Sequence, residues 1–333
     1  MTLDQDLQQL EDTGRWRALT AVPKKFRYFS RETYFRESWQ LARKALGART
    51  LETLQRLAVL TLKPDCVIGR RVEDCITYMA ERGFRPILVS PIRYGRSNTR
   101  EIWRYQWNIA TLDRLNLGDV IHTAAPALMV VFTDEHPDDG IPASVRLAGL
   151  KGSSLPWDRH PDDLRSRLGG LNRMIVLVHC SDEPVDIVRE WGILFDRRAL
   201  AGLYDRLVEA VADPVTPDLD TPLRSLYARH PPGELGIEAA LAELDAALSK
   251  SIEPSRAAAA ARVAGAVHAA RQGDHLDWQE WFDDLRAARL GLDAWTTTVI
   301  GSHYIRHDVP GAVCIISESG RERWLAGEGL FLS

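Results

Sequence analysis

The chain has 333 residues, a hydrophobic fraction of 45% and a formal net charge of −4 at pH 7. This length excludes a small scaffold held together by disulfides and leaves room for two domains. The negative net charge argues against general nucleic-acid binding, which needs a cationic excess. The sequence also has no run of about 18 apolar residues that would cross a bilayer.

The N-terminus and the cysteines indicate the cellular compartment. Residues 1–12 are polar and acidic, whereas a secretory signal has a basic stretch followed by an apolar one. Cys66, Cys75, Cys180 and Cys314 lack the C-x-x-C pairing of zinc sites and redox dithiols. We therefore expect a cytoplasmic protein with reduced thiols, no metal bound by the chain alone and no membrane partner.

Residues 1–55 predict an N-terminal helical arm. Charged and aromatic residues alternate in it, and helical spacing runs over residues 31–46. The cluster of Lys24, Lys25 and Arg27 suits contacts with phosphate groups as well as an ordinary surface or interface role, so both interpretations stay open.

Residues 56–207 predict a sheet domain. The continuous apolar run LAVLTL is typical of a strand buried on both faces, and Gly83 ends a helical pattern before the next strand. The expected elements are a strand at 57–62, a helix at 72–82, a strand at 84–92, a helix at 98–117, a strand at 127–132, a short helix at 143–150, a strand at 174–178 and a helix at 184–195. This order predicts an α+β fold of the ferredoxin-like (split βαβ) type with an antiparallel sheet. Since that fold carries many functions, the function must be argued from the site.

Residues 208–333 predict a mostly helical C-terminal domain that ends in a hairpin at 312–325. The amphipathic segment 274–292 carries Trp278, Trp281 and Phe282 and is expected to pack on the sheet domain or on a second subunit, with substrate capping as the alternative. The motif HYIRHD at 303–308 has the spacing of two metal-binding histidines on a helix, but its β-branched approach argues against a helix there.

Several short motifs in the sheet domain suggest chemistry. Lys63 leaves the first strand and precedes Pro64 and a helix start, an arrangement that suits a phosphate group. Further along follow KGSSLPWD at 151–158, DLRSR at 163–167, and HCSD at 179–182 before a helix that carries Glu190.

The order and the intervals of these motifs resemble those of the nucleoside diphosphate kinase family over residues 56–207. The resemblance implies a kinase fold and a phosphotransferase that moves a γ-phosphoryl group from a nucleoside triphosphate to a nucleotide-like or other small acceptor. It also implies Mg²⁺ on the nucleotide phosphates, and a homo-oligomer unless the flanking regions cover the family's contact surfaces. The residue roles that it implies are phosphorylation of His179, support of this histidine by Ser181 and Glu190, and phosphate contacts by Lys63, Ser154 and Arg165.

The sequence departs from the family pattern at several positions. Cys66 and Cys180 stand where the family has glycine, and Val176 stands where it has the asparagine that holds the sugar, although Asn172 lies close by. Ala148 replaces a second phosphate-binding arginine, with Arg146 and Lys151 as the nearby substitutes.

The nucleobase contact also follows the family pattern poorly. Tyr105, Trp107 and Arg114 are candidates to stack on a base, and buried aromatic residues in a helical layer are the alternative.

The chemistry of the matched residues agrees with phosphotransfer. A neutral imidazole attacks a phosphoryl group, and a carboxylate on its other ring nitrogen fixes the tautomer and stabilises the developing charge. Three functions remain: an enzyme that forms phospho-His179, a silent nucleotide-binding or sensing domain with the C-terminal half as effector, and an interaction protein that uses the domain as a scaffold.

Overall fold

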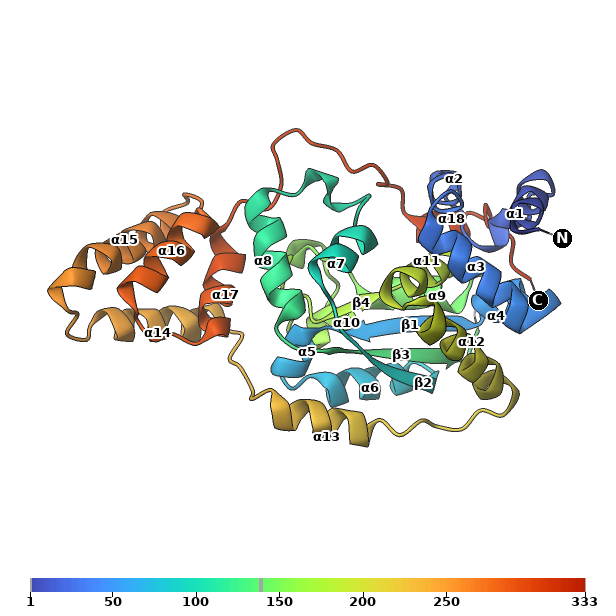
Figure 1. The fold of residues 1–333 in the computed structure, drawn as a ribbon, viewed down its shortest axis with the longest axis horizontal. Helices are drawn as coiled ribbons and strands as arrows, with labels where there is room; N and C mark the ends of the chain where they lie inside the picture. The colour runs from blue at the N-terminus through green and yellow to red at the C-terminus, as the bar shows by residue number, and fades with distance from the viewer. Residues whose placement is uncertain (1, 138–139, 333) are drawn as a thin grey trace.

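The computed structural model describes residues 2–137 and 140–332, and its centre is a four-stranded antiparallel sheet (Figure 1). The strands are β1 (Leu57–Leu62), β2 (Phe84–Ile92), β3 (Ala127–Asp134) and β4 (Val178–Cys180), in the spatial order β2-β3-β1-β4. Leu60 of β1 pairs with Val130 of β3 on one side and with Cys180 of β4 on the other. This topology confirms the predicted α+β, ferredoxin-like fold.

Helices cover both faces of the sheet, which is why every residue of β1 is buried. Because successive side chains of a strand point to opposite faces, Leu60 and Leu62 join one hydrophobic cluster while Leu57 and Val59 join the other. The helices that contribute to the first cluster within the sheet domain are α5 (Pro64–Ile68), α6 (Val72–Glu81), α8 (Leu112–Thr123), α9 (Ala143–Lys151) and α10 (Leu164–Arg167). The helices of the second cluster are α1 (Leu3–Asp12), α2 (Pro23–Phe29), α3 (Thr33–Leu46), α4 (Thr50–Gln55), α7 (Arg96–Ile102), α11 (Pro184–Leu194) and α12 (Arg197–Ala212).

The C-terminal part is mostly helical and extends the first of these clusters. Its helices are α13 (Asp220–Arg229), α14 (Ile237–Leu248), α15 (Pro254–Arg271), α16 (Trp278–Ala288), α17 (Ala294–Tyr304) and α18 (Gly320–Leu325). Figure 1 shows α14 to α17 beside the sheet region, with α17 next to α8. Trp278 packs so closely on Gly301 of α17 that a Cβ there would lie 2.5 Å from its ring and 3.3 Å from Leu117 of α8. The amphipathic helix therefore packs against the rest of the same chain, as one of the sequence alternatives predicted.

Among the described residues, no helix has both the length and the apolar character that a membrane span needs. Short 3₁₀ turns also occur between the longer helices and strands. The turns are at Arg15–Ala18, Gly47–Arg49, Trp107–Ile109 and Pro156–Asp158.

Three sequence predictions of helices and of the terminal hairpin were wrong. Residues 312–325 form no hairpin: 320–325 are helical, because Ser319 Oγ accepts from Glu322 N and caps a helix. The helix expected at 98–117 is broken into α7, a 3₁₀ turn and α8, whose N-cap is Thr111. The β-branched segment before His303 is helical, since Thr298 Oγ1 donates to a carbonyl one turn earlier and so satisfies its hydroxyl inside the helix.

The fourth strand lies later than predicted, at 178–180 instead of 174–178. Leu177 has a left-handed backbone with φ of 67°, which is costly for a branched side chain. Its amide donates to Asp65 Oδ2 at 2.8 Å, and Lys63 Nζ donates to the carbonyl of Met174 at 3.0 Å. These buried contacts hold the approach to β4 out of the extended conformation.

Candidate active site

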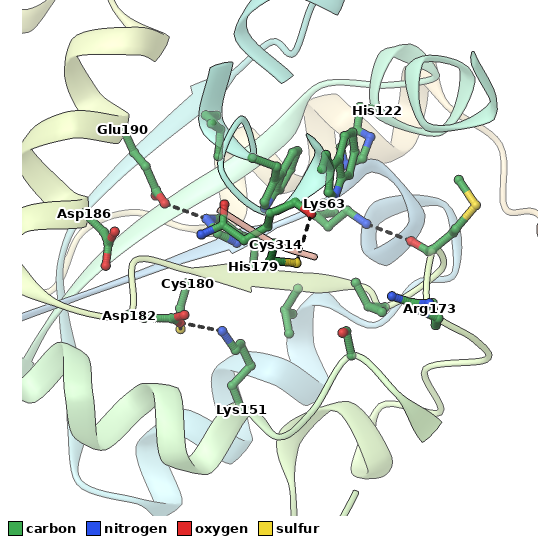
Figure 2. A pocket seen from close by; sticks show the side chains of 18 of the residues that line it. Lys63, His122, Lys151, Arg173, His179, Cys180, Asp182, Asp186, Glu190 and Cys314 are labelled. Atoms are coloured by element: carbon green, nitrogen blue, oxygen red, sulfur yellow. Dashed lines mark hydrogen bonds and ion pairs between the residues drawn. The ribbon is translucent and has the colours of Figure 1, made fainter. Parts of the chain in front are cut away.

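A cavity of about 330 Å³ lies where β4, α11 and the segment between α7 and α8 meet (Figure 2). The candidate side chains from the sequence that line it are Lys25, Lys63, Trp107, Arg114, Lys151, Ser154, Arg165, His179 and Glu190. Further lining residues that sequence reasoning did not assign to a site are Trp103, Gln106, His122, Arg173, Asp182, Asp186 and Arg189.

His179 is held by a carboxylate and a hydroxyl. It lies on β4 opposite Thr61 of β1, and its Nε2 is 2.9 Å from Oε1 of Glu190 on α11. Ser181 Oγ donates to the other oxygen of Glu190 at 2.7 Å. The structure thus brings together the three residues to which the resemblance assigns the histidine and its support.

The charge state of Glu190 decides which nitrogen of His179 is protonated. Burial by itself raises the pKa of Glu190, but the charge of His179 and the hydrogen bonds from His179 and Ser181 outweigh burial and lower this pKa below its ordinary value. An ionised carboxylate only accepts hydrogen bonds, so Nε2 of His179 carries the proton. In the neutral ring, Nδ1 then has a free lone pair, and no described residue hydrogen-bonds to it.

Aromatic rings form one wall of the site. The Trp103 ring meets the His179 ring edge-on, with centroids 5.2 Å apart, and stacks on Trp107 at 4.8 Å. His122 lies beside Trp103, and burial lowers its pKa well below the ordinary value, with Lys63 adding to the shift. The ring of His122 is therefore neutral, and its Nδ1 contacts the carbonyl oxygen of Gly118 at 2.6 Å.

Buried cations lie close to His179. Burial lowers the pKa of Lys63, although its Nζ lies 3.6 Å from Asp65 Oδ2. Burial also lowers the pKa of Arg165 to about 10, and its Nη atoms donate to the carbonyls of Gly152 and Val178 at 2.9 and 3.0 Å. Nε of Arg165 has no partner among the described residues. A buried guanidinium with one unpaired N–H at a cavity wall favours an anionic ligand.

Lys151 is one of the two substitutes considered for the missing arginine, and it reaches the cavity. Its Nζ lies 2.6 Å from Asp182 Oδ1. Burial lowers the pKa of Lys151, but the charge of Asp182 outweighs burial and raises it, so the ammonium group is ionised.

Lys25 is a cation of this site that comes from the N-terminal arm. It lies on α2, where Nζ is 2.6 Å from Asp186 Oδ2 and 3.0 Å from Glu183 Oε2. Asp186 is among the lining residues, as is Lys25 itself. The only sequence signal for Lys25 was its basic neighbourhood, which fitted an interface equally well.

Three predicted site residues do not line the cavity: Ser181, which contacts it only through its hydrogen bond to Glu190, Arg146 and Tyr105. Arg146, the other substitute, has its Nε 3.0 Å from Asp134 Oδ2 and its guanidinium over the Phe84 ring. Tyr105 donates its hydroxyl to Glu32 at 2.6 Å and stacks on Tyr28. The predictions for Arg146 and Tyr105 are corrected by this placement, because partners within the chain hold each side chain elsewhere.

The departures from the family pattern are accommodated in different ways. Cys66 and Cys180 both belong to the first hydrophobic cluster, and Cys180 also lines the cavity, where burial raises its pKa to about 12 and keeps it a thiol. Val176 lines the cavity in place of an amide. Asn172 does not replace it, since its Oδ1 accepts from the amides of Met174 and Ile175.

Comparison with known proteins gives partial likenesses. No protein-family model matches the chain. The thioredoxin domain-containing protein 3 homolog of Heliocidaris crassispina is 23% identical over 149 residues, which cover 44% of this chain and 17% of that protein. The chain therefore matches less than a fifth of the length of this curated relative.

Among solved structures, the chain is similar to nucleoside diphosphate kinases. The Aquifex aeolicus enzyme has 16% identity and a TM-score of 0.35, with 42% of this chain and 95% of that one covered. The Pyrobaculum aerophilum enzyme has 15% identity and a TM-score of 0.35, with 44% and 98% covered. The Halobacterium salinarum enzyme in complex with CDP has 17% identity and a TM-score of 0.30, with 38% and 76% covered.

Proposed function

We propose that the chain is a phosphotransferase that carries a phosphoryl group on His179. The observation that supports this most directly is the pairing of Nε2 with Glu190, which leaves Nδ1 as the nucleophilic nitrogen in a cavity with buried cations. Residues 56–207 form the catalytic domain in this proposal. The donor is a nucleoside triphosphate, and the acceptor is a nucleotide-like or other small molecule.

The proposed reaction has two displacements. The Nδ1 lone pair attacks the γ-phosphorus, an N–P bond forms, and the bond to the bridging oxygen breaks to release the nucleoside diphosphate. The ring is then cationic, and the carboxylate of Glu190 on Nε2–H stabilises its charge. An acceptor oxygen next attacks phosphorus, the N–P bond breaks and neutral His179 returns.

The cations around His179 supply the electrostatic part of catalysis in this proposal. Lys63, Lys151 and Arg165 line the cavity, and charge develops on the oxygens of a transferring phosphoryl group. Fixed donors in a buried site stabilise that charge without reorganisation. Ser154 also lines the cavity and offers a hydroxyl to the same group.

Mg²⁺ enters in this proposal as part of the nucleotide substrate. No group of three His, Cys, Asp or Glu side chains suited to hold a metal occurs in the described part of the chain. Mg²⁺ commonly uses substrate phosphates, waters and one or two carboxylates, and Asp182 and Asp186 are the lining carboxylates not engaged with His179. When bound with the nucleotide, the ion would neutralise part of the charge of the phosphates.

A silent nucleotide-binding domain is the second candidate. It is favoured by the pairing of Lys151 with Asp182 and of Lys25 with Asp186, since both cations already have protein partners. A bound nucleotide would then be sensed without transfer.

Intact-protein mass after brief incubation with Mg²⁺ and ATP or GTP tests the enzyme against the silent domain. We expect the wild type to gain one phosphoryl group, His179→Ala to gain none, and a nucleoside diphosphate to discharge the wild-type adduct. Triphosphate binding by calorimetry without any mass gain would overturn the phosphotransferase and leave the sensing domain.

A further inference from the structure

Two arginines that line the cavity share one carboxylate. Arg114 lies on α8 and Arg173 in the segment before β4, and both pair with Asp308. Arg173 Nη1 is 2.5 Å from Asp308 Oδ2, and Arg114 Nη1 donates to Oδ1. Nε of each arginine is buried without a hydrogen-bond partner among residues 2–137 and 140–332. Two guanidinium groups thus face a single negative charge.

The neighbouring histidine, His307, adds no further positive charge. Burial lowers the pKa of His307 to about 4, and the charges of Arg114 and Arg173 contribute to the shift. The ring is therefore neutral at neutral pH. The Trp107 ring lies against Arg114, with 5.7 Å between its ring centroid and the guanidinium carbon.

Asp308 belongs to a strap, residues 306–316, that crosses the segment between α7 and α8. Val309 N donates to the carbonyl of Ile109 at 2.8 Å, and Ile316 N donates to that of Tyr105 at 3.2 Å. Cys314 of the strap lines the cavity. Figure 2 shows Arg173 at the opposite end of the pocket from Asp186 and Glu190.

We propose that Arg114 and Arg173 form a second anion subsite, which takes a phosphate group of the ligand and which Asp308 occupies when no ligand is bound. The planar guanidinium fork matches phosphate as well as carboxylate, and a phosphate dianion balances two guanidinium charges where one carboxylate balances a single charge. Ligand phosphate then displaces Asp308 and loosens the strap. This inference rests on the proposed function for the place of the reacting group, and it adds that the ligand has a phosphate group away from His179.

Inorganic pyrophosphate is the probe for this subsite, and its affinity is measured by calorimetry. Asp308→Asn removes the competing charge, so we expect binding at least about fivefold tighter, the lower end of measured couplings between sites. In the presence of Arg173→Gln, the same Asp308 substitution gives no gain. Asp119→Asn is the matched control, because Asp119 is also shared by two arginines, Arg96 and Arg100, that do not line the cavity. Unchanged or weaker binding by Asp308→Asn, or a gain that persists with Arg173→Gln, overturns the proposal.

Hydrogen exchange of the wild-type chain gives a second reading that needs no substitution. Pyrophosphate is expected to speed exchange of the amides of Val309 and Ile316, because the strap loses its charged contact. Unchanged or slower exchange at saturating pyrophosphate contradicts displacement of Asp308.

Two further ligands distinguish the sources of the phosphate group. Adenosine diphosphate and fructose 1,6-bisphosphate are titrated in parallel against the wild type and Asp308→Asn. If Asp308→Asn tightens the binding of adenosine diphosphate alone, the subsite takes a nucleotide phosphate chain. If it tightens the binding of fructose 1,6-bisphosphate, the subsite takes a phosphorylated metabolite. All of these measurements concern binding. If they give the expected results and His179 nevertheless forms no adduct, the anion subsite stands and only the proposed phosphotransferase activity is contradicted.

Discussion

Nε2 of His179 on β4 lies 2.9 Å from Oε1 of Glu190 on α11, the helix that follows this strand in the chain. The helix begins at Pro184, and its start is fixed by Asp186 Oδ2, which accepts from the amide of Glu183 at 2.9 Å. This cap determines which side of the second turn of α11, where Glu190 lies, faces β4. The geometry of the His179–Glu190 pair therefore depends on how the helix starts.

Replacement of Glu190 by glutamine should slow formation of phospho-His179 about 10- to 100-fold. A hydrogen bond to a charged group contributes about 1.5–3 kcal/mol, and the amide cannot stabilise a cationic ring as a carboxylate does. Ser181→Ala should have a smaller effect, about tenfold, because Glu190 keeps its contact with His179. Rapid-quench labelling with ATP measures both rates, and thermal unfolding serves as the folding control. A wild-type rate in Glu190→Gln would show that the carboxylate does not support the histidine.

Arg165→Gln should lower the rate of phosphoenzyme formation by about 10²- to 10³-fold, the usual cost of losing one donor to developing charge. Arg146→Gln is the matched control, since Arg146 pairs with Asp134 and does not line the cavity. Its rate of phosphoenzyme formation should stay within about twofold of the wild-type rate, because Arg146 cannot donate to the charge that develops in the cavity. Equal losses in both variants, with unchanged unfolding temperatures, would contradict the role of Arg165.

Asp65→Ala should destabilise the fold by about 3–5 kcal/mol, because it leaves Lys63 as an uncompensated buried charge. Asp65 also accepts from the amide of Leu177, whose left-handed conformation it holds next to β4. The free energy of unfolding from urea titration measures the loss. The control is Asp74→Ala, whose pair with Arg71 is exposed and should contribute at most about 1 kcal/mol. Similar losses at Asp65 and Asp74 would show that the buried pair is not a main support of the site.

The stability contributed by Glu190 should disappear in acid. Its folded pKa is lowered from an ordinary value of 4.5, so the folded state binds this proton less readily than the unfolded chain does. The contribution is fully present above pH 4.5 and falls as the pH drops through the folded pKa. Urea titrations of the wild type and Glu190→Gln at neutral pH and at several pH values below 4.5 measure it. The stability difference between the two should shrink towards acid, and a difference that grows in acid would contradict the direction of the pKa shift.

Local pattern was enough for much of the fold. The strands at 57–62 and 84–92 were predicted with the bounds that the structure has, because continuous apolar runs between turn residues specify buried strands. The order of elements then gave the antiparallel arrangement of the sheet. The approach to β4 was misplaced because Asp65 and Lys63, more than 100 positions away, hold it by hydrogen bonds.

The sequence by itself determined the ferredoxin-like sheet, which follows from local periodicity, and its motifs carried the family resemblance that implies the set of matched polar residues. Only the tertiary structure decided which cations line the cavity. Lys25 and Arg173 come from segments far apart in the chain, and no local pattern links them. Arg146 was excluded for the same reason, because Asp134 and Phe84 hold it elsewhere. The strap that brings Asp308 to Arg114 is likewise a long-range contact, made by backbone hydrogen bonds that any sequence can form.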